Sequence, residues 1–173
     1  IGGGVILDDA PVRHKRNVPA VIEALRIKEG GSAGDRVEQT LVELKTALPV
    51  AAQLAAKLGM EAEQLAAELG GLLGAGSIVE PLPGRYIASS ALEEVAASCK
   101  TLLAGYHAKN PLHAGMKAAE LRQKLFRAMD QTIADALLSE LCREGVIRRA
   151  GERYALAEFE VRYTKRQNAI RDK

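Results

Sequence analysis

The residues of this chain best suited to a chemical role are basic and polar side chains in its second half. The chemistry they favour is binding of nucleic-acid phosphate. In a helix-turn-helix, the second helix enters a groove and its polar face carries the contacts. A predicted helix over 130–144 has such a face, and the hairpin predicted after it adds arginines, which can hold phosphate with two hydrogen bonds. The candidate contacts are Gln131, Arg143, Arg148, Arg149 and Arg153. Because acids alternate with these bases, an ordinary solvated surface is the competing interpretation.

Two further basic clusters lie near the ends of the chain. The first is Arg13, His14, Lys15 and Arg16, and the second is Arg162, Lys165 and Arg166 around Tyr163. The first would be either a solvated linker or a contact to RNA or a neighbouring domain. The second would be either a helix surface or a further nucleic-acid contact.

Catalysis and metal binding have little support in the sequence. His14, His107 and His113 have no cysteine or carboxylate at metal-ligand spacing, and neither H-E-x-x-H nor G-x-S-x-G is present. The glycines at 2–4 lack the Gly-Lys-Ser/Thr end of a phosphate loop. We therefore expect no catalytic residue, metal or cofactor here. His107 is expected to end a helix, where a positive imidazole would stabilise the helix dipole.

The chain contains the same module twice. The segment AAQLAAKL at 51–58 is echoed by AAELRQKL at 118–125, and each copy is followed by a glycine with β-forming residues and then by an Arg-Tyr pair. The offsets are 67 (118 − 51), 69 (145 − 76) and 68 (153 − 85) residues. An offset this constant indicates a duplication. The order helix, helix, β-hairpin is that of a winged helix, so the predicted fold is mainly α with small hairpins, arranged as tandem winged-helix domains.

The predicted elements follow this duplication. We expect the end of an upstream β-domain and a linker helix over 1–34, a first winged helix over 35–88, a second over 89–157, and a truncated further unit over 158–173. In the first module Asp35 caps a helix to about Ala47, Pro49 opens the next helix, Gly59 ends it, and a third helix covers 61–73. In the second, helices cover 89–107, 117–125 and 130–144, with Asp130 as cap and Gly145 as stop. The hairpins cover 77–88 and 146–157.

Charge, cysteine content and apolar runs limit the possible functions but do not identify one. The net charge of +2 is too mild to indicate nucleic-acid binding by itself. Repeat 47–88 has two bases against four acids, repeat 116–157 has eight against six, and 158–173 has five against three, so positive charge accumulates toward the C-terminus. Cys99 and Cys142 are expected to be reduced, mostly buried thiols. With no long apolar run and no signal peptide, we expect a cytoplasmic protein without a membrane partner. The start at Ile1 indicates an excised piece of a longer chain.

Particular motifs resemble one family. The block Gly2-Gly3-Gly4-Val5-Ile6-Leu7-Asp8 with Pro11 and Arg13-His14-Lys15-Arg16 resembles the last strand and exit of the third domain of the selenocysteine-specific elongation factors, the SelB family. The turn Asn110-Pro111-Leu112-His113-Ala114-Gly115-Met116 before Ala119-Glu120-Leu121-Arg122 resembles that family's second winged helix. Together these motifs extend the resemblance over nearly the whole chain.

The resemblance implies a role in translation. The parent protein would be a cytosolic GTPase that uses GTP and Mg²⁺ and carries selenocysteyl-tRNA to the ribosome at a UGA codon, tethered to a hairpin of the selenoprotein mRNA. The family's last winged helices, which would lie beyond Lys173, grip that hairpin. This chain would then be a non-catalytic spacer or an array that contacts RNA or the ribosome. No GTP-binding motif is present.

Two other classes of function stay open. A DNA-binding transcriptional regulator would carry a basic recognition helix in both modules and form a dimer. A protein-docking array would expose an apolar patch of several hundred Å².

Overall fold

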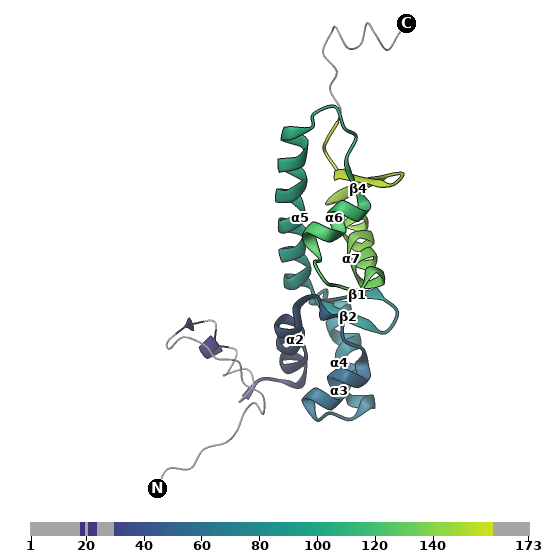
Figure 1. The fold of residues 1–173 in the computed structure, drawn as a ribbon. Helices are drawn as coiled ribbons and strands as arrows, with labels where there is room; N and C mark the ends of the chain where they lie inside the picture. The colour runs from purple at the N-terminus through teal and green to yellow at the C-terminus, as the bar shows by residue number, and fades with distance from the viewer. Residues whose placement is uncertain (1–17, 20, 24–29, 161–173) are drawn as a thin grey trace, which may run out of the picture. The chain divides into compact units, whose positions relative to one another are not determined.

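The structure, a computed structural model, describes Val18, Pro19, residues 21–23 and residues 30–160. The chain divides into two compact units, one ending at Ser90 and the other beginning at Ala91 (Figure 1). The predicted glycine-rich strand of 1–17, most of the linker helix over 18–29 and residues 161–173 of the predicted further unit lie outside the described residues. Pro19 and residues 21–23 are helical.

The first unit consists of helices followed by an antiparallel hairpin. Its elements are α2 (Ala33–Leu44), a 3₁₀ turn (Lys45–Ala47), α3 (Ala51–Leu58), α4 (Ala62–Ala75), β1 (Ile78–Leu82) and β2 (Arg85–Ala88). β1 and β2 pair with Ile78 opposite Ala88. Aliphatic side chains from all of these helices and both strands form the core, among them Val37, Leu41, Leu54, Leu65, Leu69, Ile78 and Ile87.

The start of α2 differs from the prediction. The helix is capped by Ser32, and Asp35 is its third helical residue. The Asp35 backbone N–H donates to the Ser32 hydroxyl at 3.1 Å, and the Ser32 N–H donates to the Asp35 carboxylate at 2.9 Å. This reciprocal capping box satisfies two N–H groups that the helix leaves unpaired. The prediction that Asp35 caps the helix was therefore wrong, because its carboxylate serves the reverse half of the box.

The second helix of the first unit begins later than predicted. Its cap is Val50, and Pro49 lies outside the helix. The reason is a tertiary contact: the Tyr86 N–H donates to the Pro49 carbonyl at 3.2 Å, and Val50 forms a β-bridge with Arg85. Gly59 ends the helix as predicted, with a φ of 61° that glycine adopts without strain.

The second unit repeats this order and adds one strand. Its elements are α5 (Ser89–Lys109), β3 (Met116–Lys117), α6 (Ala118–Leu125), α7 (Gln131–Arg143), β4 (Ile147–Ala150) and β5 (Arg153–Leu156). The strands form an antiparallel sheet in the order β3-β5-β4. Its core includes Leu92, Cys99, Leu103, Met116, Leu121, Leu137, Leu138 and Leu141. Sequence reasoning placed a turn before α6 and missed β3, which is too short to show an alternating pattern.

The two units share one plan, and this confirms the predicted fold class of winged helices. α3 and α6 begin at Ala51 and Ala118, and β2 and β5 begin at Arg85 and Arg153. β3 corresponds to the single bridge of Val50 in the first unit, because Lys117 pairs with Arg153 as Val50 pairs with Arg85. In each unit, the residue before the second helix therefore extends the wing.

Candidate nucleic-acid interface

Helix α7 occupies the position of a recognition helix. The Asp130 carboxylate accepts from the N–H groups of Thr132 at 2.8 Å and Ile133 at 3.4 Å, which confirms it as the cap. Gly145, with a φ of 72°, follows the last turn as predicted. The helix buries a leucine-rich stripe toward the core and leaves Gln131, Thr132, Ser139 and Arg143 exposed.

Two of the predicted phosphate contacts, Gln131 and Arg143, lie on α7 and have different surroundings. Gln131 is exposed at the first helical position, where the positive end of the helix dipole favours an anion. The Arg143 guanidinium pairs with the Glu140 carboxylate at 2.8 Å. Because the Glu140 side chain is 7% exposed and that of Arg143 is 70% exposed, the arginine mainly neutralises a buried acid while its other donors face solvent.

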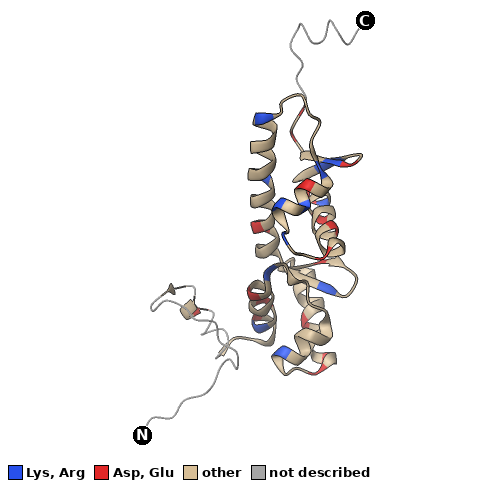
Figure 2. Cartoon of the chain, viewed as in Figure 1, with Lys and Arg blue, Asp and Glu red and all other residues tan. Residues whose placement is uncertain are grey.

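The wing presents two exposed arginines, Arg148 and Arg149, and Figure 2 shows both basic and acidic positions on this hairpin. The Arg148 guanidinium donates to the Phe159 carbonyl at 2.8 Å. Arg149 donates through Nε to the Gly151 carbonyl at 2.9 Å, and its guanidinium lies 5.9 Å from the centre of the Tyr154 ring. An arginine has five N–H donors, so both side chains keep donors for phosphate.

Arg153 has a different role from its neighbours on the wing. Its half-buried guanidinium donates to the Gly115 carbonyl at 3.0 Å. The first unit has the same bond, from Arg85 to the Leu48 carbonyl at 2.9 Å. This repeated bond, which we call the wing clamp, ties the second hairpin strand to the turn before the second helix. The geometry favours an internal role for Arg153 over a phosphate contact.

Gly115 is required for the close approach of the clamp in the second unit. A Cβ at this position would collide with the backbone carbonyl of Tyr154. Glycine therefore lets the turn lie directly against strand β5, and β3 forms beside it.

An ion pair that sequence reasoning missed lies between α6 and α7. The Arg122 guanidinium donates to the Asp135 carboxylate at 2.6 Å, with the side chains 25% and 41% exposed. Both groups lie close enough to Tyr154 to affect its pKa, which burial raises first and which Arg149 and Arg122 lower. The pair neutralises the acid on the outward face of α7, which would otherwise repel phosphate. The sequence feature that could have indicated this ion pair is Arg122, which occupies the position of Ala55 in the first repeat.

The corresponding helix of the first unit carries no positive charge. α4 has the sequence AEQLAAELGGLLGA, with Glu61 as its cap and with exposed Glu63 and Gln64. The acidic surface of this helix would repel phosphate.

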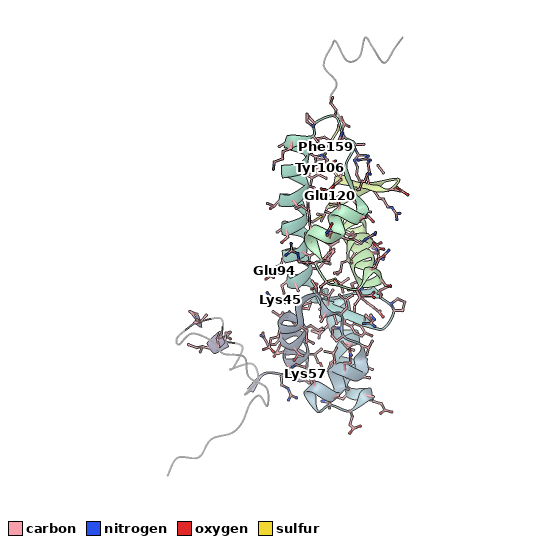
Figure 3. The ribbon with its side chains drawn as sticks, in the orientation of Figure 1. Lys45, Lys57, Glu94, Tyr106, Glu120 and Phe159 are labelled. Carbon is pink, nitrogen blue, oxygen red and sulfur yellow. The ribbon has the colours of Figure 1, made fainter. Side chains whose placement is uncertain are left out.

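His107 does not act as a positive charge at the end of α5. Its side chain is 5% exposed, its ring stacks on Phe159 with centroids 3.5 Å apart, and its Nε2 accepts from the Leu156 N–H at 3.4 Å. Burial, and then the charge of Arg148, lowers the pKa of the imidazole below its ordinary value of 6.5. The expected dipole role was wrong, because burial beside a cation favours the neutral ring. Figure 3 labels Phe159 and Tyr106 near this end of α5.

The other titratable candidates are structural. His113 is exposed, and its Nδ1 lies 3.0 Å from the Tyr106 hydroxyl. Cys99 and Cys142 are free thiols. Burial, with a smaller effect of Cys142, raises the pKa of Cys99 to about 11, so its thiol is unreactive at neutral pH.

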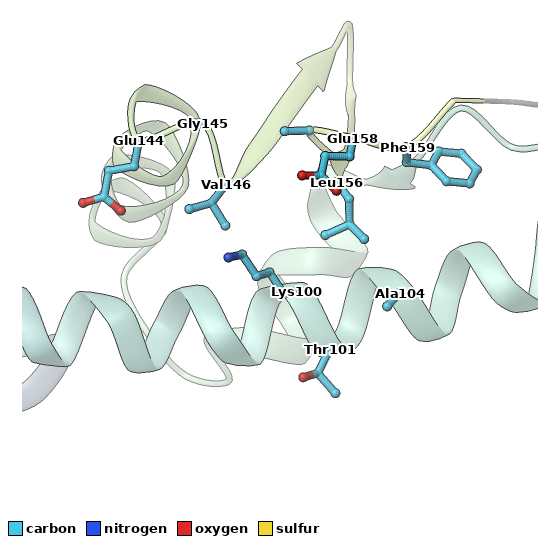
Figure 4. A pocket seen from close by; sticks show the side chains of 10 residues that line it. Lys100, Thr101, Ala104, Glu144, Gly145, Val146, Leu156, Glu158 and Phe159 are labelled. Atoms are coloured by element: carbon cyan, nitrogen blue, oxygen red, sulfur yellow. The ribbon is translucent and has the colours of Figure 1, made fainter.

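A cavity of about 650 Å³ lies between α5 and the segments that flank the wing (Figure 4). Its polar side chains include Lys100, Thr101, Glu144 and Glu158. Burial raises the pKa of Glu144, and Glu140 and Glu93 raise it further. The lining has neither a nucleophile paired with a base nor a set of metal ligands, so it supports no catalytic reading.

Other features of the chain bear on the predicted site. In the described part, no group of three or more His, Cys, Asp or Glu side chains is placed to hold a metal. No helix among the described residues is both long and apolar enough to span a membrane. The basic candidates Arg13, His14, Lys15, Arg16, Arg162, Lys165 and Arg166 lie outside the described residues.

Comparison with known families bears on the second unit. Residues 101–156 match the family described as "Elongation factor SelB, winged helix", the second such domain of that protein. The matched range runs from the middle of α5 to the end of β5 and so covers the clamp, α7 and the wing. Over this range the second unit is similar to a SelB winged helix. No curated protein matches the sequence.

Among solved structures, the chain is similar to the mRNA-binding domain of elongation factor SelB from E. coli in complex with SECIS RNA. The identity is 19%, the match covers 69% of this chain and 96% of that chain, and the TM-score is 0.49. A likeness at this level assigns no role to individual residues, and the similarity of the second unit to SelB rests on the family match.

Proposed function

We propose that this chain is a non-catalytic arm of a selenocysteine-specific elongation factor and that its second unit contacts RNA through the wing. The observation that carries the proposal is the coincidence of two features. The similarity to a SelB winged helix spans 101–156, and the hairpin in this range exposes two arginines with free donors, Arg148 and Arg149. Guanidinium groups on a protruding hairpin are suited to the phosphate backbone.

Electrostatics around α7 support an RNA contact. Its outward acid, Asp135, is paired with Arg122, and Gln131 is exposed at the positive end of the helix. A phosphate approaching the wing and the start of α7 therefore meets Arg148, Arg149 and Gln131, with one exposed acid, Glu152, in the turn of the hairpin. The exposed acid nearest to Gln131 in the sequence is Asp130, and its carboxylate accepts a backbone hydrogen bond as the cap of α7.

The wider role belongs to the same proposal. The parent protein would be a cytoplasmic GTPase that uses GTP and Mg²⁺ and brings selenocysteyl-tRNA to the ribosome at UGA codons. The arm would help to tether it to an mRNA hairpin. The first unit would serve as a spacer, because its recognition helix carries acids and no base.

A DNA-binding regulator fits the two units less well. Such a protein needs a basic recognition helix in each module to read two half-sites. α4 is the equivalent helix in the first unit, and it carries acids and no base.

Binding of the whole chain to a selenoprotein mRNA hairpin tests the proposal. Binding is measured by fluorescence anisotropy across a salt series, with tRNA and duplex DNA as comparison ligands. Arg148→Ala and Arg149→Ala should each weaken hairpin binding and reduce the steepness of its salt dependence by about one unit.

Arg85→Ala is the matched control, since it removes an arginine of the first unit's wing that is held by the clamp. It should leave RNA affinity unchanged in protein that remains folded. No binding to any RNA, or equal losses for Arg85 and Arg148, would contradict a contact through the second wing.

A further inference from the structure

The same surface carries a salt bridge in the second unit and apolar side chains in the first. In the second unit, the crease between α6, α7 and the wing holds the Arg122–Asp135 ion pair beside Tyr154. The equivalent positions in the first unit are Ala55 (122 − 67), Ala66 (135 − 69) and Tyr86 (154 − 68). Two alanines thus stand where the duplicate has a salt bridge.

The consequence in the first unit is an open hollow, which we call the apolar groove. It has a volume of about 340 Å³, and its lining includes Ala51, Ala55, Ala66, Gly70, Leu73 and Tyr86. Ala66 and Gly70 are exposed, and a Cβ at Gly70 would meet nothing within 4 Å. The groove therefore presents carbon atoms to solvent and has space for incoming side chains.

Acids flank the groove, and Arg85, the base that flanks the lining residue Tyr86, is held by the wing clamp. Glu61 and Glu63 flank the lining residue Ala62 in the sequence, and Glu80 lies close enough to Tyr86 to add to the rise in its pKa that burial causes. Lys57, the base of α3, is two residues beyond Ala55, which puts it about 200° around the helix from the lining. A partner would thus meet an apolar floor beside acids.

We propose that the apolar groove of the first unit is a docking site for a protein helix whose apolar face is flanked by lysines or arginines. Large side chains on one face of a helix fit a groove lined by small residues, and basic flanks complement the nearby carboxylates. A nucleic acid is disfavoured, because no lining residue offers a cationic donor. The proposal is independent of RNA binding by the second unit.

The test measures binding of a fluorescent amphipathic helical peptide, with leucines on one face and lysines on the other, to the whole chain. A matched peptide replaces the lysines with glutamates. The decisive variant is the double substitution Ala55→Arg with Ala66→Asp, which transfers the ion pair of the second unit and leaves net charge unchanged. We expect it to weaken peptide binding by about tenfold or more, since charged groups would occupy the apolar floor.

The control is the double substitution Ala56→Arg with Ala67→Asp, at exposed positions outside the groove lining. It should leave the affinity unchanged. Circular dichroism checks folding, and Gly70→Lys gives a second way to block the groove because the position has open space and lysine favours a helix. Nuclear magnetic resonance shifts should fall on 51–55 and 66–73.

Four outcomes would overturn the proposal. They are no binding to the wild-type chain, equal binding to the groove-blocking variants, equal binding of the glutamate peptide, and chemical-shift changes at 51–55 and 66–73 when hairpin RNA is added without the peptide. The last would make the groove a nucleic-acid surface. A failure of the RNA experiment alone would leave the docking proposal standing, because it involves the other unit.

Discussion

At the scale of single residues, the arginines of the second wing divide by their partners. Arg148 and Arg149 bond to nearby carbonyls with exposed side chains, whereas Arg153 reaches the turn before α6. Residue type alone made all three look like phosphate contacts. Mutation of Arg148 or Arg149 would remove a hydrogen-bond donor from the surface. Mutation of Arg153 would remove a link between two segments.

Arg153→Ala should therefore lower stability more than it affects RNA binding directly. It leaves the Gly115 carbonyl without its donor, and we expect the free energy of unfolding in urea to fall by about 1–3 kcal/mol. Arg149→Ala is the control and should change it by less than about 0.5 kcal/mol. Equal effects would mean that the clamp does not stabilise the unit.

His107 makes the stability of the second unit depend on pH. The folded state lowers the pKa of the imidazole, so below the ordinary value of 6.5 the unfolded chain binds the proton more readily. This contribution to stability should be fully present above that value and should be lost as the pH falls below it. Urea titrations of the wild type and of His107→Phe should show a smaller pH dependence in the variant. An identical profile would exclude His107 as the source.

At the scale of elements, most helix caps and helix ends could be predicted from neighbouring residues, whereas contacts between distant segments could not. Asp130, Gly59 and Gly145 were predicted correctly because caps and glycine stops act within one turn. Ser32 was missed although its capping box is local, because Asp35 with Glu38 offers the same spacing. β3 and the wing clamp were missed for a different reason. The clamp joins residues 37 and 38 positions apart, and the Arg122–Asp135 bond spans 13 positions between two helices. Such contacts require knowledge of how the segments pack.

The cap of α7 offers a test at this scale. Asp130→Ala removes the acceptor for two backbone N–H groups and should cost about 1 kcal/mol of unfolding free energy. Asp130→Ser, which can still accept one of these bonds, should recover most of the loss. If serine behaves like alanine, the stability at this position does not come from capping.

At the scale of the whole molecule, duplication has produced two units with separate cores and different surfaces. Leu41, Leu54 and Ile87 lie in the core of one, and Leu103 and Leu137 in the core of the other. The second wing carries exposed arginines, while the first unit carries an apolar groove and acids. One scaffold thus presents two different surfaces.

Because each unit has its own core, residues 89–160 should fold when expressed alone. We expect a cooperative thermal transition by circular dichroism and RNA affinity close to that of the whole chain. A fragment without a cooperative transition would show that the second unit depends on the rest of the protein.

Duplication also bears on how the chain reaches its fold. Neighbouring segments with the same order of helices and strands can exchange equivalent strands while folding, a recognised source of misassembly in tandem domains. The two hairpins here have different neighbours. β5 lies between β3 and β4, whereas β2 pairs with β1 and otherwise meets only the single bridge of Val50. A strand taken from the first unit would bring the same Arg-Tyr pair, Arg85 and Tyr86, but would place Ile87 where the second unit has the fully buried Ala155. The larger side chain would overpack that core, which disfavours the exchange.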